Sequence, residues 1–398
     1  MTRQLYIFII LMFSYTGVYA QKKQMDQVRS IIKSGKNLDK AEKTTSELMK
    51  NSANKDNKKM YMLWYQTVQA QYDAANEKLY LNQKQDTAQF FKMTLRMFNI
   101  LEALDSVDMK PDKKGRVAPE YRRKNAEILD TYRRNLLSAG IFFVRHADYN
   151  NAMTYLNAYI DCTRQPIFTG YDYLMNDGNL PQAAYWYGYS AIELKQWEKV
   201  LEYKDLAFKD TATTRFTQKY VAEAYSALND EENYLATLLD GFRMFPDDSY
   251  FFTRIIDLYV TRQKPQLALE IADEALKTNG DNTLFLYAKS NQLLMLGRYD
   301  EAVEVCRKII AIDENMAEAY YNEGTAYLNK ILELDKQPST RKLRKQMAEI
   351  YRMALPVMEK YRQLKPRESR KWAPALYRIY LNLNMGKQFE EIDRILKK

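Results

Sequence analysis

The sequence predicts an all-α protein, an α-solenoid built from stacked helix-turn-helix repeats. Residues of the same type recur at intervals of 34, and each interval holds two stretches whose apolar residues have helical spacing. Gly and Pro are scarce, with 12 Gly and 10 Pro among 398 residues, roughly half their usual share. This scarcity argues against a turn-rich β fold. The hydrophobic fraction of 46% is sufficient for a buried core.

Residues 1–20 have the pattern of a secretory signal peptide. A positive residue, Arg3, precedes an apolar stretch at 5–13, and cleavage is expected after Ala20. An uncleaved anchor is the weaker alternative, because the stretch is about half the length that a membrane-spanning helix needs. Position 21 is Gln and not the Cys that lipid attachment requires. We therefore expect an exported protein with no membrane span after cleavage, periplasmic in a Gram-negative cell and otherwise secreted.

Residues 21–132 are expected to form an N-terminal helical region, made of degenerate copies of the repeat that cap the array. The stretch 34–49 fits the turn and second helix of a unit with one residue added. Long helices are expected around 60–76 and 86–107, and the polar stretch 109–119 is the expected loop. A separate helical domain is the alternative interpretation of this region.

Residues 133–398 hold the regular part of the repeat. Its units are expected at 133–166, 181–214, 215–248, 249–282 and 283–316, with a longer unit at 317–368 and a partial one from Ser369. Small residues recur where the two helices of a hairpin must approach closely, because a bulky side chain there would force the helices apart. They are Gly140, Gly188, Ala222 and Gly324 in first helices, and Ala152, Ala268, Ala302 and Ala354 in second helices.

The turn and helix residues of the later units identify a family resemblance. They are Gly297, Tyr299, Ala302, Gly324, Ala326, Tyr327 and Trp372. In these residues the chain resembles tetratricopeptide repeat proteins, of an exported bacterial type. The resemblance covers about two-thirds of the chain and implies a right-handed superhelix of stacked helix pairs. Ile256 and Ser290 replace the small first-helix residue and Tyr234 replaces the second-helix Ala, so these contacts should be spaced differently.

Two insertions interrupt the period, one near 167–180 and one near 330–347. Both are expected to project from the solenoid. The second should lengthen both helices of its hairpin, with Pro338 at the tip. Pro356 lies within the continuing helical pattern and should kink or end the second of these helices.

The resemblance also implies a concave groove, formed by the first helices, that binds an extended or helical segment of another protein. The positions that should line it are Tyr185, Tyr189, Lys219, Glu223, Asp257, Tyr287, Asn291, Tyr321 and Thr325. Tyr offers a large contact area with a hydrogen-bonding tip. The alternative is that these Tyr side chains pack between repeats. The family's carboxylate clamp is matched only by Asn291 and Asn322, because Tyr287 stands where the clamp has Lys.

Charge is unevenly distributed along the chain. The formal net charge is +9, and residues 337–372 hold eleven Lys or Arg and three Glu, a net of +8. In contrast, residues 223–257 have a net charge of −6. The predicted basic patch comprises Arg341, Lys342, Arg344, Lys345, Arg367, Arg370 and Lys371. It is either a solvated face or a surface that steers an acidic protein partner. Nucleic acid is not expected, because no nucleic-acid module is recognisable.

Residues suited to catalysis are few. The single His146 lies at the end of a first helix and is expected to be structural. Cys162 and Cys306 are expected to be free, packed thiols, because several hairpins separate them. No Gly-rich phosphate loop is present. We therefore expect no catalytic residue, metal site or cofactor, and a protein that is not an enzyme.

The function predicted from the sequence is that of a non-catalytic protein–protein interaction scaffold of the cell envelope. The alternative is a glycan-binding protein of a nutrient-capture system, because Tyr and Trp faces stack on sugars. An all-helical enzyme is the third hypothesis, and it would need a pair of acidic residues in a closed cleft. The sequence identifies neither the partner protein nor the oligomeric state.

Overall fold

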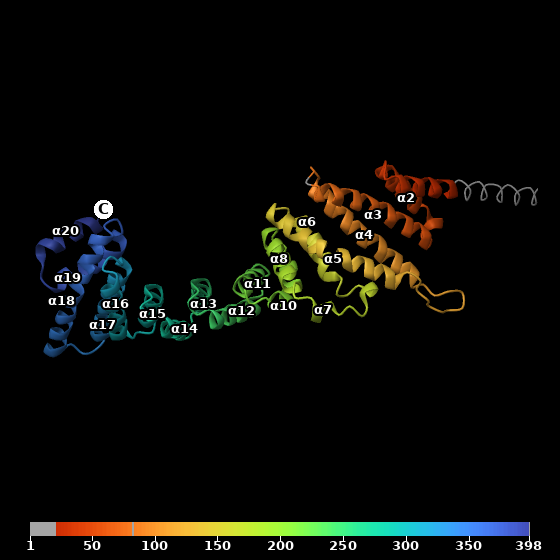
Figure 1. Cartoon of the computed structure of the whole chain (residues 1–398). Coiled ribbons are helices and arrows are strands. Elements are labelled where there is room, and N and C mark those ends of the chain that lie inside the picture. The colour runs from red at the N-terminus through yellow and green to blue at the C-terminus, as the bar shows by residue number, and fades with distance from the viewer. Residues whose placement is uncertain (1–20, 82, 398) are drawn as a thin grey trace, which may run out of the picture. The chain divides into compact units, whose positions relative to one another are not determined.

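The computed structural model describes residues 21–81 and 83–397, and these residues fold into helices joined by turns (Figure 1). The described part contains no β-strand, so the predicted all-α fold is confirmed. The predicted signal peptide, residues 1–20, lies outside the described residues. The chain divides into two compact units, called here unit 1 (Met1–Leu228) and unit 2 (Asn229–Lys398). The division predicted between residues 132 and 133 stays a prediction.

Unit 1 is a series of helical hairpins. In chain order its helices are residues 21–34, α2 (Leu38–Lys50), η1 (Ser52–Asn54), α3 (Lys58–Tyr80), α4 (Thr87–Asp108), α5 (Arg122–Arg145), α6 (Tyr149–Asp161), η2 (Pro166–Phe168), α7 (Tyr173–Asn176), α8 (Leu180–Glu193), α9 (Trp197–Glu202), α10 (Lys204–Ala207) and α11 (Thr214–Ala227). One apolar core extends from α3 to α11. The two long helices and the loop predicted before residue 120 are confirmed, and this loop extends from the unit (Figure 1).

Unit 2 contains the more regular repeats. Its helices are α12 (Glu231–Met244), α13 (Ser249–Thr261), α14 (Pro265–Thr278), α15 (Thr283–Met295), α16 (Tyr299–Ile312), α17 (Ala317–Asp335), α18 (Arg341–Leu364), α19 (Ser369–Asn382) and α20 (Gly386–Leu396). The first helices α13, α15 and α17 begin at residues 249, 283 and 317, at the predicted interval of 34. A core that extends from α14 to α20 holds the later hairpins together.

The turn between the two helices of a hairpin repeats with the same period. In four consecutive hairpins one turn residue has a left-handed backbone, at an interval of 34 residues: Lys195 (φ 56°), Asn229 (φ 58°), Gln263 (φ 54°) and Gly297 (φ 73°). The amide of the residue after Gly297 donates to the carbonyl oxygen of Leu293, at 2.9 Å, which closes the end of α15. The 34-residue period is therefore a period of backbone conformation as well as of side chains.

The small residues predicted at the helix crossings are buried except for Gly188, which is half-buried, and they are not equally crowded. A Cβ atom on Gly140 would lie 2.4 Å from Leu156 Cγ, and one on Gly324 would lie 2.2 Å from Met358 Sδ. A Cβ atom on Gly188 would meet nothing nearer than 4.0 Å. The expectation of a tight crossing is therefore wrong at Gly188, where the second helix of the hairpin is short and breaks between α9 and α10.

The first insertion packs against unit 1, and the prediction that it projects is wrong. Ile167, Phe168 and Tyr173 are each at most 9% exposed, and η2 contacts α4 and α5. The Tyr173 hydroxyl donates a hydrogen bond to the carboxylate of Asp130 on α5, at 2.7 Å. These apolar side chains bury because their removal from water stabilises the folded state.

The second insertion lengthens both helices of its hairpin, as predicted. Helix α17 has 19 residues and α18 has 24. Pro356 lies inside α18, which continues to Leu364, so this Pro does not end the helix, and the alternative of a kink stays a prediction. Pro356 and Arg352 are both exposed, so water can reach the carbonyl group of Arg352, which Pro356 leaves without its helical donor.

The two Cys residues and the single His were the side chains considered for catalysis, and their contacts are with neighbouring parts of the fold. Cys162 and Cys306 are buried free thiols, as predicted. His146 is the C-terminal cap of α5, where a ring nitrogen lies 2.8 Å from the carbonyl oxygen of Phe142. The imidazole also lies against the Phe142 ring, with 4.2 Å between the ring centroids.

Candidate partner-binding site

A groove of about 500 Å³ lies between α13 and α15, the first helices of two consecutive hairpins of unit 2. We call it the α13–α15 groove. Its lining residues are Phe252, Thr253, Ile256, Asp257, Val260, Leu284, Tyr287, Ala288, Asn291, Gln292, Leu294 and Met295. Three of the predicted groove residues, Asp257, Tyr287 and Asn291, therefore lie together as expected.

The groove has apolar walls that are partly open to solvent. Val260 and Leu284 are each 37% exposed and Met295 is 54% exposed, while Phe252 and Ile256 are buried beside them. Large apolar side chains that are grouped on a surface indicate a site of interaction more strongly than isolated ones do. The grouping thus makes the groove a candidate binding site.

Sequence reasoning missed the apolar walls because apolar residues in a helical pattern are assigned to the core. A signal was nevertheless present in the spacing. Val260 lies three residues after Asp257, and Leu284 lies three residues before Tyr287. Residues three apart share a helix face, so the predicted polar positions pointed to these neighbours.

Hydrogen bonds between α15 and α17 fix the amide groups beside the groove. The side-chain nitrogen of Asn322 donates to the hydroxyl of Ser290 at 2.9 Å and to the side-chain oxygen of Asn291 at 2.8 Å. The Ser290 hydroxyl donates to the carbonyl oxygen of Tyr287 at 2.8 Å. The side-chain oxygen of Gln292 is buried and has no hydrogen-bond partner in the described part of the chain. The side-chain oxygen of Asn291 is thus engaged, while that of Gln292 is not.

Asp257 is the only lining residue with a formal charge. Its side chain is exposed, and it has no ion-pair partner among residues 21–81 and 83–397. The nearby cations are otherwise engaged. Lys289 of α15 pairs with Asp273 of α14 at 2.7 Å. The guanidinium of Arg254 lies over the Tyr250 ring, 3.6 Å from its centroid. The groove is therefore apolar with one acidic group at its border.

Tyr321 and Thr325, also predicted for the groove, lie on α17 and do not line it. Tyr321 packs against Tyr361 of α18, with 5.0 Å between the ring centroids. The ammonium of Lys371 lies 5.7 Å from the Tyr321 ring. For Tyr321 the alternative interpretation, packing within the repeats, therefore agrees with the structure.

The two tyrosines predicted for the groove in unit 1, Tyr185 and Tyr189, lie in a cluster of aromatic side chains. The cluster contains Tyr149, Tyr185, Trp186, Tyr189 and Tyr220, all half-buried. The rings of Tyr185 and Tyr220 are stacked with 6.0 Å between centroids, and Tyr189 lies 5.8 Å from Trp186 and 5.9 Å from Tyr149. Sequence reasoning found Tyr185 and Tyr189 and missed Trp186, which is on the same helix, α8. It also missed Tyr149 of α6 and Tyr220 of α11, which helix packing brings to them.

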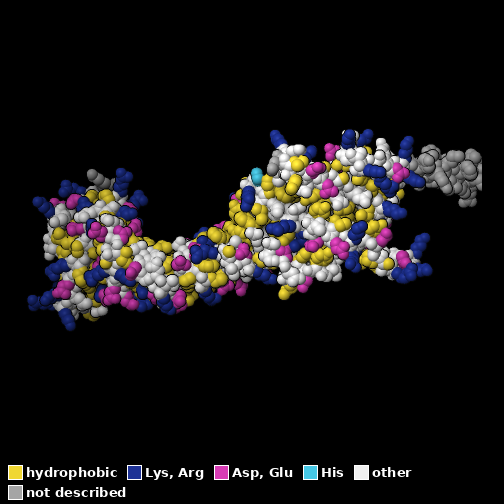
Figure 2. Space-filling view, in the orientation of Figure 1, with side chains coloured by type: hydrophobic (Ala, Val, Ile, Leu, Met, Phe, Trp, Pro, Cys, Tyr) yellow, Lys and Arg dark blue, Asp and Glu magenta, His cyan; other side chains and the backbone are white. Residues whose placement is uncertain are grey.

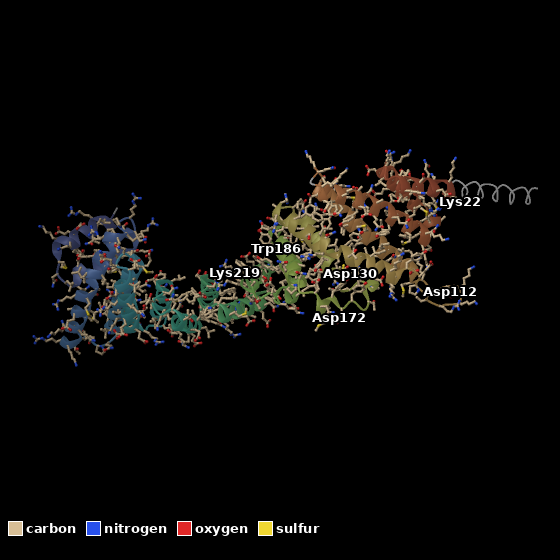
Figure 3. The ribbon with its side chains drawn as sticks, viewed as in Figure 1. Lys22, Asp112, Asp130, Asp172, Trp186 and Lys219 are labelled. Atoms are coloured by element: carbon tan, nitrogen blue, oxygen red, sulfur yellow. The ribbon has the colours of Figure 1, made fainter. Side chains whose placement is uncertain are left out.

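Hydrogen bonds and burial raise the pKa of two tyrosines of this cluster, Tyr189 and Tyr220. A hydrogen bond with Tyr149, followed by burial, raises the pKa of Tyr189 to about 12. Burial, followed by a hydrogen bond with Tyr185, raises the pKa of Tyr220. Lys219 and Glu223 lie on α11, which packs against α8, the helix that carries Tyr185; Figure 3 marks Lys219 and the neighbouring Trp186.

The predicted basic residues do not form one patch. Arg341, Lys342, Arg344 and Lys345 are exposed on the first turns of α18, whereas Arg367, Arg370 and Lys371 follow the C-terminal end of that helix. Helix α18, with 24 residues, is about 36 Å long at 1.5 Å per residue, and the two groups lie at its opposite ends. In the view of Figure 2, Lys and Arg side chains are accordingly spread among acidic ones over the C-terminal helices.

Within the described ranges, no group of three or more His, Cys, Asp or Glu side chains is arranged to hold a metal ion. In the same residues, no helix combines the length and apolar character needed to cross a membrane.

Comparisons with known proteins concern the fold alone. No family model and no curated protein matches the chain. The structure is similar to that of YrrB, described as a TPR protein with an unusual peptide-binding site, with a TM-score of 0.35 and 17% identity over 48% of this chain and 90% of that one. For MamA of Desulfovibrio magneticus RS-1 the TM-score is 0.36 and the identity 18%, over 46% of this chain and 95% of that one.

A further similar structure is the C-terminal part of a TPR repeat-containing protein from Cytophaga hutchinsonii, with a TM-score of 0.43 and 12% identity. That similarity covers 64% of this chain and 92% of the other. The chain's own hairpins establish its architecture. They recur every 34 residues, with left-handed turns at the same interval and small residues at the crossings, and this is the tetratricopeptide arrangement.

Proposed function

We propose that this α-solenoid of tetratricopeptide-type hairpins is a non-catalytic interaction scaffold that binds a segment of a partner protein in the α13–α15 groove. The observation that carries the proposal is the group of exposed apolar side chains, Val260, Leu284 and Met295, beside a groove of about 500 Å³. A partner that covers these side chains removes apolar surface from water, which favours binding.

The fixed polar groups beside the groove support the same proposal. Asn291 is held by Asn322, so its side chain is ordered before any partner arrives. Binding then costs less conformational entropy than it would at a mobile surface. The side-chain nitrogen of Asn291 remains able to donate a hydrogen bond, because the bond to Asn322 uses the oxygen.

The surroundings of the two thiols support a function without catalysis. Burial raises the pKa of Cys162 to about 12 and that of Cys306 to about 12. The reactive form of cysteine is the thiolate, so neither side chain is a good nucleophile near neutral pH.

The envelope location is part of the proposal and is supported by the signal-peptide pattern of residues 1–20. The intact mass of the protein recovered from its own cells tests it. We expect a mature chain that begins at Gln21 and is recovered with the periplasmic or secreted fraction. A chain that retains residues 1–20, or one found with the cytoplasm, would contradict the location.

Crosslinking in intact cells tests the groove. A photo-reactive amino acid in place of Asn291 should capture a partner protein, and Leu284→Glu should abolish the capture because it places a charge in the apolar wall. Leu267→Glu is the matched control, since Leu267 is also 37% exposed but lies on α14, outside the groove. Equal capture by the two variants, or no capture by the parent protein, would contradict the proposed site.

The aromatic cluster of unit 1 supports a second candidate function, the binding of a glycan. Half-buried rings such as Trp186 and Tyr189 offer apolar faces with polar edges, which suit the apolar face of a sugar ring. A glycan array with the purified protein tests this candidate. Binding to a defined glycan that is lost in Trp186→Ala supports it, and an array without signal removes it.

A further inference from the structure

We infer that the partner segment bound in the α13–α15 groove carries a Lys or Arg within one helical turn of an aliphatic anchor residue. The anchor lies against Val260, Leu284 and Met295, and the cation pairs with Asp257. The inference rests on the proposed function and adds to it the chemistry of the partner.

The charges around the groove carry the inference. Asp257 stands at the border of an apolar surface and has no cationic partner in the part of the chain that the structure describes. The two cations of the same helices are engaged with other side chains, because Lys289 pairs with Asp273 and Arg254 lies over Tyr250. A partner that covers the apolar walls also removes water from around Asp257. The carboxylate then needs a new partner to offset that loss.

Other partner chemistries fit the groove less well. An acidic segment would face the carboxylate of Asp257, and no cation lines the groove to receive it. A purely apolar segment would leave Asp257 partly desolvated and unpaired.

Peptide selection tests the inference directly. The purified full-length protein is used to select binders from a phage-displayed library of random twelve-residue peptides, and enriched peptides are then synthesised. We expect aliphatic residues with Lys or Arg within four positions. Affinity should fall about fivefold in Asp257→Asn, the effect of an exposed ion pair, and its dependence on salt should weaken. Peptides in which the cation is replaced by Glu should bind Asp257→Lys better than the parent protein.

Controls separate this inference from the proposed function. Glu304→Gln is the matched control for Asp257→Asn, because Glu304 is exposed on α16, outside the groove, and should leave affinity unchanged. If the selected peptides lose binding in Leu284→Glu but are indifferent to both Asp257 variants, the groove function stands and the cation preference is overturned. If no peptide is enriched, or if binding survives Leu284→Glu, both fail. Circular dichroism and thermal melting confirm that each variant is folded.

Discussion

Arg133 of α5 and Asp177, which precedes α8, form a buried ion pair at 2.5 Å, with side chains that are 6% and 9% exposed. The guanidinium of Arg133 lies between the rings of Tyr159 and Tyr173, 3.9 Å from each centroid. It also donates a hydrogen bond to the carbonyl oxygen of Tyr159, at 3.2 Å. This arrangement joins α5, α6 and the first insertion, and it explains why the insertion packs against unit 1.

Removal of the carboxylate should destabilise unit 1. Asp177→Ala leaves Arg133 buried without a counter-charge, which we expect to lower the free energy of unfolding by about 3–5 kcal/mol. Urea denaturation followed by circular dichroism measures the change. Asp172→Asn is the control in the same insertion, because Asp172 is exposed and its left-handed backbone (φ 49°) suits Asn. Similar losses in both variants would contradict the role given to the buried pair.

The same pair should make unit 1 sensitive to acid. Burial raises the pKa of Asp177, but hydrogen bonds from the hydroxyl of Tyr159, the amide of Asn179 and the guanidinium of Arg133 hold it below its usual value. A lowered pKa in the folded state stabilises the protein above the unfolded value, about 3.9 for Asp. This stability should disappear as the pH falls through the folded-state pKa. Urea melts from pH 7 to pH 2 should show an acid loss that Asp177→Asn lacks.

Glu102 of α4 should have the opposite dependence on pH. Burial, followed by the charges of Asp161 and Asp105, raises the pKa of Glu102 to about 7. The carboxylate therefore lowers stability above its unfolded pKa, and the loss grows up to about pH 7. Glu102→Gln should raise the free energy of unfolding by about 2 kcal/mol at pH 8 and by little at pH 4.5.

Urea denaturation at these two pH values checks the Glu102 prediction. The exposed Glu198 on α9 provides the control, since Glu198→Gln should change stability by less than about 0.5 kcal/mol at both pH values. A Glu102→Gln gain that is the same at pH 8 and pH 4.5 would show that the titration of Glu102 is not its cause.

Two glycines at the same repeat position should respond differently to an added methyl group. Gly140→Ala places a Cβ atom 2.4 Å from Leu156 Cγ, and Leu156 is fully buried, so we expect a loss of about 1–3 kcal/mol. Gly188→Ala has room for the methyl group and should be neutral or slightly stabilising, because Ala favours helix. Thermal melting of both variants checks the difference. Leu156→Ala should offset part of the Gly140→Ala loss, and strict additivity of the two changes would contradict the steric explanation.

At residues with a left-handed backbone, replacing Gly by Ala should lower stability and replacing Ala by Gly should raise it. Gly297→Ala forces a Cβ onto a backbone with φ 73° and should cost about 1 kcal/mol, although the space around it is open. Ala147→Gly relieves the same strain at φ 54° and should stabilise the protein slightly. Thermal melting compares them with Gly386→Ala, whose Cβ would also meet nothing within 4 Å but whose backbone is not left-handed. Destabilisation of Gly386→Ala equal to that of Gly297→Ala would contradict the backbone explanation.

The repeat pattern predicted some residues that line the groove and others that do not. The 34-residue period placed Asp257, Tyr287 and Asn291 on first helices, and the structure brings them together in one groove. Tyr321 was placed by the same rule and instead packs against Tyr361 of the lengthened α18. The 34-residue period assigns each residue to a helix face, but whether that face is exposed depends on how the neighbouring helix packs against it.

The helices, their pairing into hairpins and tight crossings such as those at Gly140 and Gly324 could be predicted from the sequence alone. These features depend on interactions between residues a few positions apart, which leave a period in the sequence. Three features became visible only in the folded chain: the α13–α15 groove is open, Arg133 of α5 pairs with Asp177 of the first insertion, and the basic residues divide between the two ends of α18. These outcomes depend on packing between side chains far apart in the chain, and packing at that range leaves no period that a single sequence reveals.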